Sequence, residues 1–370
     1  MKSSSLLRRG LLAAMAVPAL ALGACGSDPG SPGSSASESD SAGGGSLVIA
    51  SWGGEFSAAT EQELADPFAA QAGVKVQLVE ASSQHVAQLE AQNKAGKITW
   101  DVIDSLGEAN TAYLAKQGLL ERLPADLKAE LERVSVPGGV TDHGVLQSTI
   151  GTLLACMPEH AKVCPQTPAD FFDTENFPGS RMMYDDPYYA IQFALAADGL
   201  TQDEMWPMTD ANVERAFAKL EQIVPAVRVW WTSGDQTIQA LRDGEVEMGQ
   251  IWNRPAKQLA EQAPSASFSW DSVLLAEAYS SVPKGAPNVE TAMDYLRFYG
   301  TDPEAQARWA ARTGYGVSNA KAADFVEPED LEFSVLNPDN VATAIRGDGE
   351  WWVDNRDELT RRWRTLVSGS

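Results

Sequence analysis

Histidine and cysteine are scarce in this chain, and they do not occur in the arrangements that common enzyme chemistry requires. The 370 residues include three histidines, His85, His143 and His160, and three cysteines. None of the histidines has the spacing of a zinc site or stands beside a strand-to-helix serine elbow. The sequence also has no Walker loop and no dinucleotide-binding fingerprint. These absences favour a binding protein without catalytic residues, metal or cofactor. An exported hydrolase that uses a pair of carboxylates stays open, because such a pair needs no fixed spacing.

Basic residues are few relative to acidic ones. The sequence has 28 Lys and Arg residues against 51 Asp and Glu residues, for a formal net charge of −23 at pH 7. A surface this acidic argues against binding to nucleic acid and to anionic lipid headgroups. It leaves the charge of a ligand bound in a buried site undecided.

The apolar run near the N-terminus, residues 11–22, is too short to span a bilayer. It follows three basic residues and precedes the segment Leu-Gly-Ala-Cys25, which is the order of parts in a secretory signal. The segment resembles the bacterial lipobox, which implies a signal peptide of residues 1–24 and a diacylglycerol on Cys25. A plain signal peptide with an incidental cysteine stays open, and so does the choice between the general and the twin-arginine export route.

Residues 26–46 carry no large apolar side chain, so they cannot bury enough surface to fold. We expect residues 25–46 to form a lipidated cysteine and a flexible tether. The protein would then sit on the outer face of the cytoplasmic membrane, held there through the lipid alone. In that oxidising compartment, Cys156 and Cys164 are predicted to form a disulfide. Two free buried thiols remain the alternative, because the sequence does not show whether the two Cβ atoms face each other.

The part that follows the tether alternates strand and helix signals, and its length favours two lobes. Apolar runs at 47–51, 74–79 and 101–103 predict three strands, with helical spacing through Leu64 and Phe68 and at 82–95. This βαβαβ order predicts a parallel sheet that binds ligands at the carboxyl ends of its strands. Trp52 and residues 104–108 are expected on the loops at those ends.

A strand at 146–154 is expected to cross into a second α/β lobe. Its strands are predicted at 181–184 and 247–252, and its helices at 190–197 and 212–224. The chain is expected to return near Asp271, continue through 281–283 and a helix at 288–299, and end in a helix at 351–366. The predicted lobe 1 comprises residues 47–147 plus about 269–317, and lobe 2 comprises residues 148–268 plus about 318–370. Two lobes joined by more than one crossing make a hinge.

Seven segments, in order along nearly all of the mature chain, together resemble the extracellular solute-binding proteins of ABC importers. The resemblance is in particular to the branch that includes the spermidine/putrescine-binding proteins, although the Trp-Gly-Gly opening resembles family members for opines and amino-acid derivatives at least as well. The segments are ASWGGE (50–55), DFFDTENFPG (170–179), VWWTSGDQ (229–236), DGEVEMGQIWN (243–253), VPKGAPN (282–288), PEAQ (303–306) and TGYGVSN (313–319). The resemblance implies a type II-like periplasmic-binding-protein fold, in which two α/β lobes close over a small solute and a permease recognises the closed form. We also expect a monomer. A receptor subunit that feeds a signalling partner stays open.

The resemblance also implies which side chains meet the ligand. Aromatic rings at the cleft can sandwich an alkyl chain or hold a cation, and acids can pair with ammonium groups. The predicted ligand-binding residues are Trp52, Glu55, Glu108, Asp186, Trp231, Trp252, Glu277 and Tyr315. Asp186 aligns with an acid of the polyamine binders, but it is also a candidate N-cap for the helix that Pro187 begins. Two further acids of the polyamine site are replaced, at Tyr189 and near Ala278. The expected ligand is therefore a polyamine or another small organic cation or zwitterion.

Overall fold

The computed structural model describes residues 45–81 and 84–368. The predicted signal peptide, Cys25 and nearly all of the tether lie outside the described residues. Two residues of the predicted helix at 82–95 also lie outside them, and the helix is described from His85 onward. The described residues fall in the unit formed by residues 43–370, and only that unit is considered below.

The first half of the sheet is parallel. Strand β1 (Ser46–Ser51) lies between β2 (Lys75–Glu80) and β3 (Val102–Gly107) and is parallel to both. The helices of this half are α1 (Gly54–Thr60), which continues through η1 (Glu61–Ala65) into α2 (Asp66–Ala72), then α3 (His85–Lys94), α4 (Glu108–Lys116) and α5 (Ala125–Glu132). The predicted βαβαβ order is confirmed. The loop predicted at 104–108 is wrong, because residues 104–107 belong to β3 and Glu108 begins α4.

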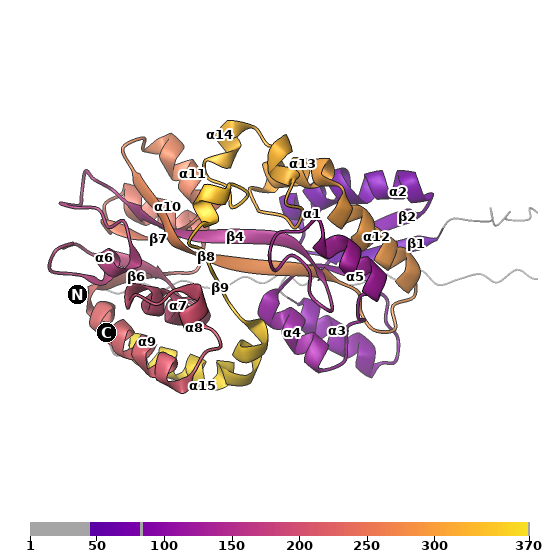
Figure 1. Cartoon of the computed structure of the whole chain (residues 1–370), viewed down its shortest axis with the longest axis horizontal. Coiled ribbons are helices and arrows are strands. Elements are labelled where there is room, and N and C mark those ends of the chain that lie inside the picture. The colour runs from indigo at the N-terminus through magenta and orange to yellow at the C-terminus, as the bar shows by residue number, and fades with distance from the viewer. Residues whose placement is uncertain (1–44, 82–83, 369–370) are drawn as a thin grey trace, which may run out of the picture. The chain divides into compact units, whose positions relative to one another are not determined.

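Two long antiparallel strands run through the middle of the sheet. Strands β4 (Val145–Cys156) and β8 (Ser267–Ser281) pair with each other along most of their length. The carboxyl end of β8 pairs with β3, and the carboxyl end of β4 pairs with β7 (Met248–Trp252). The strand order is β2-β1-β3-β8-β4-β7-β5-β6, and β9 (Ile345–Arg346) pairs with β8 (Figure 1). The predicted crossing at 146–154 is confirmed, and the return near Asp271 occurs within β8.

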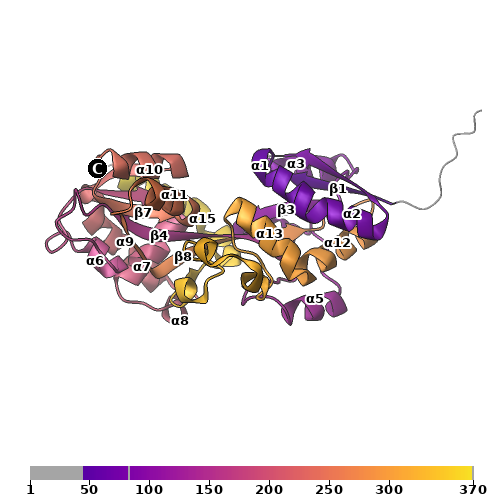
Figure 2. The same ribbon diagram turned by 90° about the horizontal axis from the view of Figure 1, so that it is seen from above.

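The second half of the sheet is again parallel. Strand β5 (Arg181–Tyr184) pairs with β6 (Val227–Trp231) and with β7. The helices of this half are α6 (Pro168–Phe172), α7 (Pro187–Ala197), α8 (Gln202–Met205), α9 (Asp210–Ile223) with η2 (Val224–Ala226), α10 (Gly234–Arg242) and α11 (Asn253–Gln262). We call the part around β1 to β3 the first lobe and the part around β5 to β7 the second lobe. Figure 2 shows α10 and α11 near one end of β4 and α1 and α2 beyond its other end. The predicted lobe boundaries stay a prediction.

The part of the chain from Val289 to Ser368 returns to the first lobe and then contacts both lobes. It consists of α12 (Val289–Thr301), α13 (Pro303–Thr313), η3 (Ala322–Phe325), α14 (Pro328–Leu331), η4 (Pro338–Val341), β9 and α15 (Gly349–Ser368). Helix α15 packs on α4 of the first lobe and on α7 of the second. Within the described ranges, no helix is both long and apolar enough to cross a membrane.

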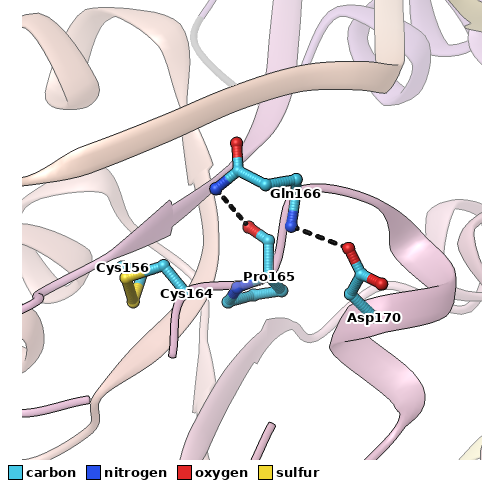
Figure 3. Close-up of a disulfide and its surroundings, with 5 residues drawn as sticks. All are labelled: Cys156, Cys164, Pro165, Gln166 and Asp170. Carbon is cyan, nitrogen blue, oxygen red and sulfur yellow. Dashed lines mark hydrogen bonds between the residues drawn. A yellow bond between two sulfur atoms is a disulfide. The ribbon is translucent and has the colours of Figure 1, made fainter. Parts of the chain in front are cut away.

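A disulfide closes the far end of β4. Cys156 and Cys164 are joined, with their Cα atoms 5.6 Å apart (Figure 3). Directly after Cys164, the chain is held by Asp170, whose Oδ2 accepts from the backbone N–H groups of Gln166 and Thr167. Thr167 and Asp170 form a capping box at the start of α6. The disulfide therefore ties the crossing strand to the first helix of the second lobe.

Candidate functional site

The register of the sheet brings the carboxyl ends of parallel strands from both lobes close together. Gly107 at the end of β3 pairs with Ala278, which pairs with Ser148 on β4. Trp252 at the end of β7 pairs with Thr152, also on β4. Four residues of strand span about 13 Å. The carboxyl ends of β3 and β7, each followed directly by the start of a helix, therefore face each other across a short stretch of one crossing strand.

A pocket of about 360 Å³ lies at this stretch. Its lining residues come from β4, from the starts of α10 and α11 and from the loop after α13, namely Ile150, Ser233, Gly234, Asp235, Trp252, Asn253, Arg254, Pro255, Gln258 and Tyr315. The pocket thus contains two of the predicted ligand-binding aromatics, Trp252 and Tyr315. Because its position matches the ends of the parallel strands, it is the candidate ligand site.

A cluster of aromatic rings supports one wall of the pocket. Tyr184, the last residue of β5, stacks on Trp231 with ring centroids 4.6 Å apart, and the edge of Trp252 meets both rings at 5.5 and 5.1 Å. Trp231 is fully buried, whereas Tyr184 and Trp252 are half-buried. Trp231 is therefore the buried member of the cluster, Tyr184 also stacks on Tyr189, and Trp252 is the member that lines the pocket.

Asp186 follows Tyr184, one member of this aromatic cluster, by two residues. Its Oδ1 accepts from the backbone N–H of Tyr188 at 2.9 Å, so it is the N-cap of α7, as the Pro187 signal indicated. Burial raises the pKa of Asp186 to about 6. Burial first, and the charge of Asp186 second, raise the pKa values of Tyr184 and Tyr189, so the carboxylate lies near both rings. Asp186 combines a capping role with a negative charge beside aromatic faces.

Glu108 and Glu277 lie deeper and already have donors from the protein. Glu108 accepts from the Tyr188 hydroxyl at 3.1 Å and from the Gly349 N–H at 3.0 Å. Burial, with help from the nearby charge of Glu277, raises the pKa of Glu108 to about 7. Glu277 accepts from Arg346 at 3.0 Å and from the Tyr279 hydroxyl at 3.2 Å, and burial raises its pKa as well. Both acids add negative potential near Tyr189, where their charges also raise the tyrosine pKa.

Trp52 and Glu55 lie on the first lobe at the start of α1. The Trp52 Nε1–H donates to the carbonyls of Asp104 and Ser105 at 3.3 and 3.1 Å, and its half-buried ring lies 4.8 Å from the ring of His85. Glu55 is exposed and forms an ion pair with Arg312 at 2.5 Å. Among the described contacts, neither side chain touches the cluster around Trp252. Tyr315 connects the pocket with the first lobe. It lines the pocket, and its ring lies 6.2 Å from the ring of Phe56 in α1.

Arg254 lines the pocket but is absent from the residues expected from the sequence. It is the second residue of α11, its Nη1 donates to the Thr313 carbonyl at 3.2 Å, and its stem packs against Gly314. The signal that could have located it is its position directly after the matching segment that ends in Asn253. Asn253 itself does not cap α11; its amide oxygen accepts from the Gly151 N–H at 3.1 Å, and its amide nitrogen donates to the carbonyls of Gly314 and Phe333.

A larger pocket of about 720 Å³ lies on a different side, between α4 and the start of α15. Its basic rim groups are paired within the protein, Lys116 with Asp354 and Arg122 with Asp142. Its lining also includes Tyr279 of β8 and Glu108, a predicted site residue that directly follows the carboxyl end of β3. Because its basic rim groups already have acidic partners, it is the weaker candidate for a ligand that carries a carboxylate. Across residues 45–81 and 84–368, no group of His, Cys, Asp and Glu side chains is arranged to hold a metal ion.

Comparison with known proteins agrees with this geometry. Residues 63–334 match the family model described as "Bacterial extracellular solute-binding protein". The gamma-aminobutyric acid-binding protein of Pseudomonas aeruginosa is 30% identical over 329 residues, which cover 87% of this chain and 91% of the relative.

Two solved structures are also similar. The Atu4243-GABA receptor has a TM-score of 0.76 and 30% identity, over 87% of this chain and 97% of the other. The spermidine/putrescine-binding protein PotD of Streptococcus pneumoniae has a TM-score of 0.68 over 87% of this chain and 99% of the other, but only 16% identity, so it supports the fold alone. These relatives are binding proteins and not enzymes. The chain therefore belongs to the family of bacterial extracellular solute-binding proteins, the two-lobed substrate receptors of ABC importers.

Proposed function

We propose that this receptor captures a small zwitterion, an amino acid whose ammonium and carboxylate groups are separated by a short alkyl chain. The observation that carries the proposal is that opposite charges flank one aromatic pair. Tyr184 and Trp252 contact each other, and Arg254 lines the pocket together with Trp252. Asp186 follows Tyr184 by two residues, and its backbone N–H donates to the Tyr184 carbonyl at 2.9 Å.

The acidic side of this arrangement suits an ammonium group. Asp186 supplies a carboxylate two residues after Tyr184, and Glu108 and Glu277 add negative potential near Tyr189. The ring of Trp252, which lines the pocket, can hold a cation through the ring quadrupole, an interaction worth about 0.5–2 kcal/mol. An ammonium group placed here would have both a charge partner and aromatic contact.

The basic side suits a carboxylate. Besides Arg254, the N-terminal residues of α10 and α11 border the pocket, and helix N-termini favour negative charge. Asp235 on α10 opposes this effect in part. A polyamine would put a second ammonium group near Arg254, which costs electrostatic energy instead of gaining it. The relatives named for gamma-aminobutyric acid support the zwitterion over the polyamine.

We further propose that Cys25 carries the lipid that holds the receptor on the membrane and that closure of the two lobes over the ligand presents it to the permease. Metabolic labelling of cells with a radioactive fatty acid tests the anchor. Label on the wild-type chain and none on Cys25→Ala is the expected result. Label on both variants, or on neither, would contradict the anchor.

The ligand class is tested by calorimetric titration of a version that begins at Ser46. The first probe is gamma-aminobutyric acid. Butyrate and n-butylamine each lack one of its two charges, and putrescine has two ammonium groups. The proposal expects gamma-aminobutyric acid to bind at least about 30-fold more tightly than either single-charge analogue, because each lost ion pair in a desolvated site costs about 2–5 kcal/mol. Tighter binding of putrescine would favour the polyamine reading and overturn the zwitterion.

A further inference from the structure

Asp104 is a fully buried carboxylate that the ligand site described above does not use. It lies in β3 with 0% of its surface exposed, and burial raises its pKa to about 7. Its Oδ2 accepts from the Ser51 hydroxyl at 2.9 Å, whereas its Oδ1 has no hydrogen-bond partner among the described residues. A buried charge with an unsatisfied oxygen costs stability. A group with that cost needs a role that a neutral side chain would not fill.

The satisfied oxygen of Asp104 ends a directed chain of hydrogen bonds. The backbone N–H of Gly53 donates to the Ser57 hydroxyl at 2.8 Å, and this hydroxyl donates to the Ser51 hydroxyl at 2.7 Å. Ser51 in turn donates to Asp104. Because each hydroxyl has one proton, the acceptor at the end of the chain fixes the direction of every bond before it. The carboxylate thereby orients the backbone of Gly53 at the start of α1.

Position 53 depends on this chain of hydrogen bonds because glycine has no side chain that could anchor the turn. Gly53 has a φ of 82°, and a Cβ there would lie 2.6 Å from the Glu80 carboxyl carbon. Only glycine fits, so the turn is fixed through backbone contacts. The hydrogen bond to Ser57 is one of those contacts.

The backbone of Asp104 also holds the neighbouring indole. Trp52 Nε1–H donates to the carbonyls of Asp104 and Ser105. The pairing of β3 with β8 is irregular between Ile103 and Leu106, and Ser105 has a φ of 50° within this irregularity. The Ser105 hydroxyl lies 2.5 Å from the Ser148 hydroxyl on β4. The strained segment thus aims two carbonyls at Trp52 while tied to the crossing strand.

We propose that Asp104 is a positioning residue for ligand capture, which acts through Ser51 and Ser57 on Gly53 and through its own strand on Trp52. This role of Asp104 rests on the proposed function in one respect, namely that Trp52 contacts the ligand when the lobes close. Asp104 does not touch the ligand itself.

The first test needs no ligand. Indole N–H resonances are recorded in ¹H–¹⁵N spectra of the chain from Ser46 onward, and the Trp52 resonance is identified by its loss in Trp52→Phe. We expect this resonance to move in Asp104→Ala and in Ser57→Ala. It should stay near its wild-type position in Asp104→Asn, which keeps an acceptor oxygen. Ser265→Ala is the matched control, because Ser265 donates to Glu159 on the surface of the second lobe. An unmoved Trp52 resonance in both Asp104→Ala and Ser57→Ala would overturn the proposal.

The second test uses gamma-aminobutyric acid as the probe in a double-mutant cycle. Asp104→Ala should weaken binding about fivefold, the value of one hydrogen bond, and Asp104→Asn should restore most of it. In a Trp52→Phe background, Asp104→Ala should cost no further affinity. An equal loss in both backgrounds would overturn the positioning role. If the wild-type chain does not bind the probe, the zwitterion proposal fails, and the indole spectra alone decide the role of Asp104.

Discussion

The hydroxyl of Tyr188 donates a hydrogen bond of 3.1 Å to the carboxylate of Glu108, and this contact joins the two lobes. Tyr188 lies in α7 of the second lobe, and Glu108 begins α4 of the first. The same carboxylate accepts from the N–H of Gly349, the first residue of α15. A Cβ at Gly347 would lie 1.7 Å from the Tyr188 hydroxyl, so glycine is required beside this junction. Three segments distant in sequence therefore meet at one buried acid.

Removing the Tyr188 hydroxyl should weaken this junction. In Tyr188→Phe the ring keeps its packing on Trp352, but Glu108 loses one of its donors. Loss of a hydrogen bond to a charged group costs about 1.5–3 kcal/mol, so the midpoint of urea unfolding should fall. Tyr113→Phe is the control, because the Tyr113 hydroxyl bonds Glu90 within a single lobe, near the surface. Equal midpoints for wild type and Tyr188→Phe would contradict the role of the junction.

Stability should decrease as the pH rises from about 5 to about 8. Burial raises the folded-state pKa values of Asp104 and Glu108 to about 7 and that of Asp186 to about 6, above their ordinary values. The folded protein therefore binds these protons more tightly than the unfolded chain. Their contribution to stability is fully present below the unfolded pKa values and is lost as the pH rises through the folded ones.

The measurement is the melting temperature across this pH range for wild type and for Glu108→Gln. The Gln variant should show a shallower fall, because it removes one of the three groups. His85 works in the opposite direction, since burial lowers its pKa, so the comparison between the two proteins is more informative than either curve alone. A wild-type curve that falls no more steeply than that of Glu108→Gln would show that this account of Glu108 is wrong.

Ligand affinity should show the opposite trend with pH. Asp186 pairs with an ammonium group only when it is ionised, and burial raises its pKa to about 6 in the empty protein. Binding of gamma-aminobutyric acid should therefore strengthen between about pH 5 and pH 7 and then level off. Asp186→Asn keeps an N-cap oxygen for α7 but has no charge to lose. Its weaker binding should not vary with pH in this range, and a wild-type-like pH profile in Asp186→Asn would argue against Asp186 as the ammonium partner.

Reduction of the disulfide should destabilise the chain. Cys156 and Cys164 are eight positions apart, and closing a loop of this size stabilises a fold by about 2–3 kcal/mol in the chain-entropy account. A reductant should lower the melting temperature of the wild-type protein. The double variant Cys156→Ser/Cys164→Ser should start at the lower value and not respond to reductant. A response of the double variant would assign the effect to something other than this bond.

Much of the fold could be predicted because periodicity and order along the chain specify it. The apolar runs located β1, β2, β4, β5 and β7 and the start of β3, and the alternation of elements predicted the parallel pairing of β1 with β2 and β3. Strand β6 was not assigned, since its short run with Arg228 in second place shows little alternation. The two crossing strands were also longer than expected, because their middle residues pair across the sheet in ways that local pattern does not reveal.

The site was harder to predict, because its character depends on contacts between distant positions. Glu55 meets Arg312 across 257 positions, and Glu108 meets Gly349 across 241. Sequence alone named candidate acids but not which of them already had partners. The sequence does not distinguish Trp231 from Trp252, yet the structure buries Trp231 and leaves Trp252 at the pocket. Arg254 was missed because a single arginine after a helix start has many structural uses.

The central claim is that Arg254 and Asp186 together recognise the two charges of one small zwitterion. The most direct measurement is calorimetric titration of gamma-aminobutyric acid into wild type, Arg254→Gln and Arg228→Gln, where Arg228 is an exposed arginine on β6 of the same lobe. The account predicts micromolar or tighter binding by wild type and by Arg228→Gln. It predicts a loss of at least about 30-fold in Arg254→Gln, because closure of the lobes would remove the ion pair of this exposed arginine from water. Equal affinity in all three proteins, or no binding to wild type, would contradict it.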